Sequence, residues 1–127
     1  MQPGRGDMPV ILVVDDDPDI RQVLHWTLED AGFAVHTAQD GPSALERAAV
    51  HAPALVVLDI GLPDTDGTVL ASHLREMCGD HIPVLVMTAD GRAAEKAQRA
   101  GAYAYLHKPF EDTELLNAVH AGLDRNF

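Results

Sequence analysis

The chain has 127 residues, a length typical of one domain that buries its own core without a disulfide or a structural metal. Its 20 acidic residues outnumber its 9 lysines and arginines, which gives a net charge of −11 at neutral pH. This charge argues against a nucleic-acid-binding surface and against an anionic membrane surface, because both need clustered lysine and arginine. A single cysteine, Cys78, and the lack of a signal peptide or a bilayer-length apolar run favour a reducing compartment, and we expect the cytoplasm.

Five segments have the composition of β-strands. In chain order they are residues 10–14, 33–38, 54–58, 84–87 and 103–107. The first, third and fourth are continuous apolar runs, a pattern typical of strands that are buried on both faces of a parallel sheet. The second alternates between apolar and polar residues and therefore resembles an edge strand.

Each strand is followed by apolar residues at helical spacing. The first stripe runs from Ile20 to Ala31, with Asp17 placed to cap the helix, Pro18 in its first turn and Gly32 at its end. The later stripes cover residues 44–49, 70–77, 93–97 and 115–123, and glycines that can end helices follow two of them, Gly79 and Gly101.

This alternation predicts an α/β fold. Strand and helix repeat five times, so we expect a doubly wound, five-stranded parallel sheet in the flavodoxin-like order 2-1-3-4-5, with its five helices on both faces. Residues 1–8 are rich in glycine and proline and are expected to form a flexible lead-in. The domain itself is expected to cover residues 9–125, with no second domain after it.

Polar residues follow the predicted strands at the edge where such sheets bind ligands. Asp15 and Asp16 come after the first strand, and Asp59 comes after the third. Thr88 follows the fourth strand, and Lys108 follows the fifth. Because the first and third strands are neighbours in this order, we expect the three carboxylates to lie together.

Three carboxylates in one crevice repel one another unless a cation joins them. Oxygen ligands of this kind favour Mg²⁺. The ammonium of Lys108 and the hydroxyl of Thr88 would complete a site for a phosphoryl group, and Asp59 can act as a nucleophile that forms an aspartyl-phosphate. The residues therefore predict a phosphoryl-accepting aspartate assisted by Mg²⁺.

Four motifs together resemble one known family. They are ILVVDDD, LDIGLPDTDG, PVLVMTAD and AYLHKPF. Each is weak alone, but in this order and at these strand ends they closely resemble the CheY-like receiver domain of two-component response regulators. The resemblance extends from about Met8 to about Asp124.

The resemblance implies roles at the acidic end of the site. Asp59 matches the phosphoacceptor of the family. Asp16 matches a direct ligand of Mg²⁺, and Asp15 matches an acid that usually acts through water. Together with Asp59, the backbone carbonyl of Gly61 matches a further protein ligand of the metal.

The resemblance also implies roles for the last two strands. Thr88 matches the hydroxyl that closes onto the phosphoryl group, and Lys108 matches the lysine that pairs with its oxygens. Tyr105 matches an aromatic switch residue whose ring turns inward in the active state. The Lys108–Pro109 peptide bond is expected to be cis by the same resemblance.

The implied function is that of a signalling switch. A histidine kinase or phosphotransfer protein would donate the phosphoryl group, and the surface of the fourth helix, fifth strand and fifth helix would change for a downstream effector or output domain. A homodimer that forms on phosphorylation is a further candidate partner, whereas nucleic acid and membrane are not expected as direct partners. The domain would assist its own phosphorylation and dephosphorylation without being a turnover enzyme.

Three alternatives carry different signatures. A Mg²⁺-dependent phosphatase with an aspartyl nucleophile generally has a second acid two residues later, where this chain has Gly61, and needs a substrate-covering cap. A flavodoxin-like cofactor binder needs a Ser-, Thr- and Gly-rich phosphate loop, whereas DDDPD is anionic. A degenerate receiver that only binds proteins would lack site residues that are present here. The seven histidines have no metal-ligand spacing.

Overall fold

The structure, a computed structural model, describes residues 8–124. The predicted alternation of five strands and five helices is confirmed. In chain order the elements are β1 (Val10–Val14), α1 (Pro18–Asp30), β2 (Ala34–Ala38), α2 (Gly41–His51), β3 (Leu55–Asp59), α3 (Gly67–Cys78), β4 (Val84–Thr88), α4 (Ala93–Ala100), β5 (Ala104–His107) and α5 (Asp112–Asp124). Apart from Met8, the predicted lead-in lies outside the described residues.

The strands form one parallel sheet in the predicted order, β2-β1-β3-β4-β5. β1 pairs with β2 on one side and with β3 on the other, and β3, β4 and β5 continue the sheet in parallel register. β2 is an edge strand, as its alternating sequence predicted. The chain reverses its direction of winding between β1 and β3, which creates the switch point where such sheets bind ligands.

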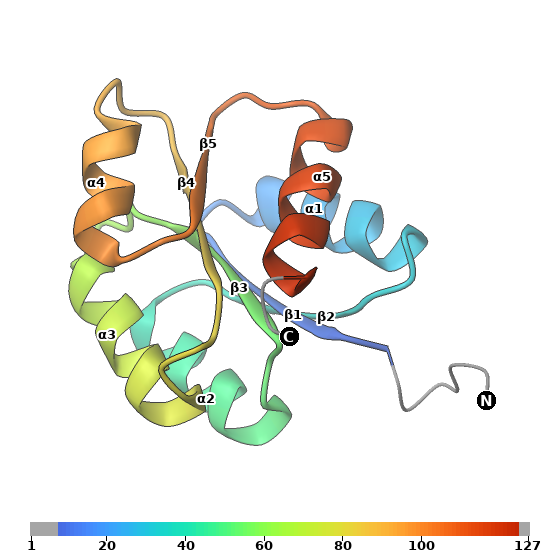
Figure 1. The fold of residues 1–127 in the computed structure, drawn as a ribbon, viewed down its shortest axis with the longest axis horizontal. Helices are drawn as coiled ribbons and strands as arrows, with labels where there is room; N and C mark the ends of the chain where they lie inside the picture. Colours follow the sequence, from blue (N-terminus) through green and yellow to red (C-terminus); the bar gives the residue numbers. More distant parts are fainter. Residues whose placement is uncertain (1–7, 125–127) are drawn as a thin grey trace.

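Helices cover both faces of the sheet (Figure 1). Side chains alternate along each strand, so Ile11 and Val13 of β1 pack in the core beneath α1 and α5. Leu12 and Val14 point the other way, into the core shared with α2, α3 and α4. The central strands are therefore buried on both faces, which explains their unbroken apolar sequences.

Short polar side chains begin the helices that follow the first three strands. Asp17 caps α1 by accepting a hydrogen bond from the Asp19 amide, and Asp66 caps α3 in the same way. Gly32, which follows α1 with a φ of 100°, occupies the left-handed region that glycine enters without strain. The caps by Asp17 and Asp66 fix the turns that leave the carboxyl ends of β1 and β3, where the polar residues gather.

Candidate functional site

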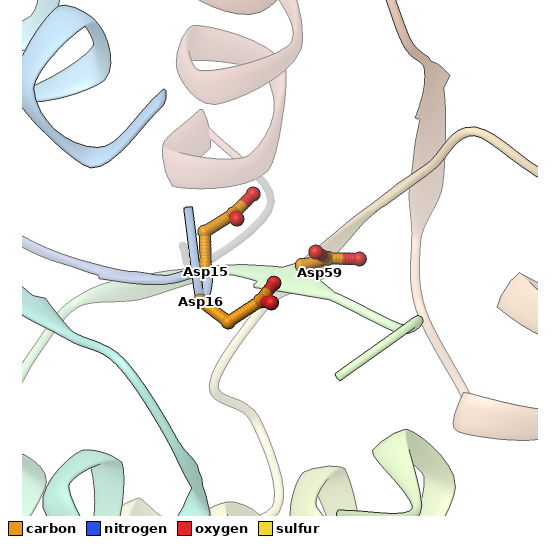
Figure 2. A group of neighbouring side chains, drawn as sticks. All are labelled: Asp15, Asp16 and Asp59. Atoms are coloured by element: carbon orange, nitrogen blue, oxygen red, sulfur yellow. The ribbon is translucent and has the colours of Figure 1, made fainter. Parts of the chain in front are cut away.

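Three carboxylates meet at the carboxyl ends of β1 and β3. Asp15 and Asp16 leave the end of β1, and Asp59 is the last residue of β3 (Figure 2). One oxygen from each lies within 4.8 Å of the others. Asp15 is fully buried, Asp59 is 6% exposed and Asp16 is open to solvent. The sheet thus brings together the three acids that the sequence placed on neighbouring strands, with an oxygen-only ligand set suited to a hard divalent cation.

Lys108, which follows β5, reaches two of these acids. Its Nζ lies 2.8 Å from Oδ2 of Asp15 and 3.2 Å from Oδ2 of Asp59. Burial opposes its charge, but the hydrogen bond to Asp15 and the negative charges of Asp59 and Asp15 outweigh that effect and raise the pKa of Lys108 above its ordinary value of 10.5. The ammonium is therefore charged and neutralises part of the cluster.

Burial dominates at Asp15. It raises the pKa of Asp15 above its ordinary value of 3.8, even though the hydrogen bonds from Lys108 and from the Asp17 amide favour the charged form. Oδ1 of Asp15 accepts the Asp17 amide hydrogen bond at 2.9 Å, and Nη1 of Arg21 donates to its backbone carbonyl at 2.7 Å. Asp15 is thus held from three sides, by the lysine, by the turn and by α1.

Asp59 is oriented by the loop that follows it. The amide of Gly61 donates a 2.8 Å hydrogen bond to Oδ1, while Oδ2 faces Lys108. The side chain is accordingly turned toward the open edge of the sheet rather than into the core, a position in which a carboxylate oxygen can meet an incoming group.

Two further predicted residues lie on β4 and β5. Thr88 is buried, and its Oγ1 accepts a 2.9 Å hydrogen bond from the amide of Asp90 in the next loop. Tyr105 is 47% exposed on β5, so its ring lies toward solvent in this structure. The Lys108–Pro109 peptide bond is cis, as expected.

The sequence model of the family described as "Response regulator receiver domain" matches residues 11–120. The chain belongs to that family.

The receiver domain resembles both curated and structurally characterised proteins. It is 45% identical over 121 residues to the response regulator MprA of Mycobacterium sp. (strain KMS), covering 93% of this chain and 52% of that protein. It is 40% identical to the transcriptional regulatory protein KdpE of Mycobacterium tuberculosis (strain ATCC 25618 / H37Rv), covering 94% and 53%. The chemotaxis protein CheY4 of Vibrio cholerae superposes with a TM-score of 0.84 at 31% identity, covering 91% of this chain and 99% of that structure.

This receiver domain spans about half the length of the curated relatives it matches. The family places the chain in a two-component response regulator. Between residues 8 and 124, no helix combines the length and the apolar character needed to cross a bilayer.

Sequence reasoning about this receiver domain missed two contacts. Arg21 follows Asp15 by six residues and carried no motif signal, yet it hydrogen-bonds the Asp15 carbonyl. Lys96 is likewise unmarked in the sequence, yet its Nζ lies 2.9 Å from Oδ2 of Asp90. Both contacts depend on how a turn folds back against the next helix, which residue spacing alone does not reveal.

Proposed function

We propose that this receiver domain accepts a phosphoryl group on Asp59, in a Mg²⁺-assisted transfer from a histidine kinase or phosphotransfer protein. The observation that carries the proposal is the convergence of Asp15, Asp16 and Asp59 on one oxygen-lined point with Lys108 bridging two of them. A buried nucleophile beside a fixed cation matches the need of phosphoryl transfer for positioning and charge neutralisation.

The metal would be held by Asp16, Asp59 and the backbone carbonyl of Gly61, with Asp15 acting through water. Bound there, Mg²⁺ supplies positive charge to the oxygens of the phosphoryl group. The donor set fits this ion, because the cluster offers oxygen atoms from Asp15, Asp16 and Asp59 at one point.

The protein side chains perform the transfer itself. A carboxylate oxygen of Asp59 forms a bond to phosphorus as the phosphorus–nitrogen bond to the donor histidine breaks, and the nitrogen keeps the electron pair. Lys108, already 3.2 Å from Oδ2 of Asp59, pairs with a phosphoryl oxygen. Thr88 donates its hydroxyl proton in a hydrogen bond to another of these oxygens.

The output of the switch is a change in the surface formed by α4, β5 and α5. As Thr88 turns toward the phosphoryl group, Tyr105 turns inward from the exposed position it occupies here. This surface then binds a downstream effector or output domain, or a second copy of the chain. The domain assists its own phosphorylation and dephosphorylation and does not turn over an outside substrate, and it makes no direct contact with nucleic acid or membrane.

Intact mass after incubation with acetyl phosphate tests the proposal. We expect one added phosphoryl group on the wild-type chain with Mg²⁺ and none with EDTA or on Asp59→Asn. Asp64→Asn is the matched control, because Asp64 is an exposed aspartate in the same loop. The control should gain the group like the wild type. Equal labelling of Asp59→Asn, or no labelling of the wild type, would overturn the proposal.

A further inference from the structure

A chain of hydrogen bonds runs from the buried Thr88 to the first turns of α4. Oγ1 of Thr88 accepts from the Asp90 amide at 2.9 Å. The carboxylate of Asp90 in turn accepts from the Arg92 amide at 2.8 Å through Oδ1, and from Nζ of Lys96 at 2.9 Å through Oδ2. Thr88, the β4–α4 loop and α4 are therefore joined through one aspartate.

The start of α4 depends on this aspartate. In the described part of the chain, the N-cap residue of α4, Arg92, makes no side-chain capping hydrogen bond. Asp90 instead receives the Arg92 amide, and Lys96 ties its other oxygen to the helix. The hydrogen bond from Lys96 is the largest of the effects that hold the pKa of Asp90 below its ordinary value of 3.8, so the Asp90 carboxylate is charged at neutral pH.

We propose that Lys96 is a positioning residue of the phosphorylation switch. By holding Asp90, it keeps the Asp90 amide on the Thr88 hydroxyl and favours the unphosphorylated arrangement of the β4–α4 loop. For Thr88 to turn toward a phosphoryl group on Asp59, this loop must move and the hold of Lys96 must loosen. The inference rests on the proposed function of Asp59 and adds a regulator of the same site.

Two substitutions separate this role from simple electrostatics. Lys96→Met removes a positive charge near the site, and Asp90→Asn removes a negative one, so steering of the anion acetyl phosphate would change the phosphorylation rate in opposite directions. Loss of the ion pair predicts the same direction for both. We expect each variant to raise the initial rate of phosphorylation by about 1.4-fold to fivefold, which is the range that corresponds to the loss of an exposed ion pair. The double variant should be no faster than the faster single variant.

Rescue and a matched control complete the design. Lys96→Arg keeps the charge and should retain the wild-type rate. Arg99→Met serves as the control, because Arg99 lies on the same helix and pairs with Glu95 at 3.7 Å, away from Asp90. It should also keep the wild-type rate. In amide spectra of the unphosphorylated chain, Lys96→Met should move the Thr88 and Asp90 signals toward their phosphorylated positions, and Arg99→Met should not.

The possible results distinguish the two proposals. If the wild-type chain takes up no phosphoryl group, the proposed function fails, and the role of Lys96 falls with it. If the wild type is phosphorylated but Lys96→Met and Asp90→Asn keep its rate, or shift it in opposite directions, only the role of Lys96 is overturned. Unmoved Thr88 and Asp90 signals in Lys96→Met would also overturn that role.

Discussion

Replacing Asp59 with asparagine should stabilise the fold when no divalent cation is present. The three acids at this site place their nearest oxygens within 4.8 Å of one another, and Asp59 is 6% exposed. At an effective dielectric constant of about 20, two unit charges at that separation repel by about 3.5 kcal/mol. The native site therefore stores electrostatic repulsion that the substitution relieves.

The attraction to Lys108 opposes this gain. Nζ of Lys108 lies 3.2 Å from Oδ2 of Asp59, and the same dielectric constant gives that contact about 5 kcal/mol. Relief of the two repulsions, with Asp15 and Asp16, is worth about 7 kcal/mol on this scale. The hydrogen bond from the Gly61 amide to Oδ1 can persist in the asparagine variant. We therefore expect the free energy of unfolding to rise by about 1 to 2 kcal/mol.

Mg²⁺ should narrow this difference in stability. An ion that binds only the folded state at ten times its dissociation constant stabilises a protein by about 1.4 kcal/mol. The wild type, with all of its carboxylates, should gain more of this stabilisation than Asp59→Asn. Lys108→Met should have the opposite effect to Asp59→Asn in the absence of the ion, because it leaves Asp15 buried without its cation.

Urea unfolding followed by circular dichroism, in EDTA and in Mg²⁺, measures these differences. Asp64→Asn is again the matched control, and as an exposed change it should alter stability by less than about 0.5 kcal/mol. The reasoning is refuted if Asp59→Asn is no more stable than the wild type in EDTA. It is also refuted if Mg²⁺ stabilises the two proteins equally.

Two further predictions concern positions away from the site. His36 stacks on His51 with ring centroids 3.5 Å apart, and burial lowers the pKa of His36 below its ordinary value of 6.5. As the pH falls, the His36 imidazole therefore takes up its proton in the unfolded chain before it does so in the folded one. The free energy of unfolding should accordingly fall as the pH drops below about 6.5. His36→Phe keeps a ring on the stack and should lose less stability between pH 7.5 and 5.5, and equal losses would contradict this account. Gly122→Ala adds a methyl group that would collide with the Tyr103 ring, so it should lower the free energy of unfolding, measured in urea, by about 1 to 3 kcal/mol. Gly91→Ala is the control and should leave this free energy unchanged, because the added methyl group would lie in open space. An unchanged stability of Gly122→Ala would contradict this prediction and would show that Tyr103 can move aside.

The order of the elements was predictable from sequence because the central strands are buried on both faces. An unbroken apolar run of strand length is typical of a strand that is buried on both faces of a parallel sheet. The predicted ends were wrong by one residue in places, for reasons that lie in the backbone. Asp59 and Thr88 belong to the strands, opposite Met87 and His107, because backbone pairing continues past the last apolar side chain. Phe33 lies outside β2, because its amide bonds to the carbonyl of Leu28 and closes the end of α1.

The gathering of acids at the site was also predictable, because strand order alone places the ends of β1 and β3 side by side. The contacts that orient them were not. Arg21 reaches the Asp15 carbonyl and Lys96 reaches Asp90, and in each case the two residues are six positions apart. That separation spans a turn and the start of a helix, so it follows none of the regular three- and four-residue spacings of a helix surface.

The unequal positions of the carboxylates around Lys108 suggest why the proposed switch responds to phosphorylation. Lys108 lies closer to the fully buried Asp15 than to Asp59, at 2.8 Å against 3.2 Å. A phosphoryl group on Asp59 adds negative charge that this lysine has to share with Asp15, so further donors are needed. The buried hydroxyl of Thr88 is such a donor at the end of the neighbouring strand, and the loop that holds it is the one that Lys96 ties to α4. On this account, the negative charge that the phosphoryl group adds at Asp59 drives the movement of Thr88 and its loop. The ion pair between Lys96 and Asp90 opposes this movement and so sets how readily phosphorylation produces it.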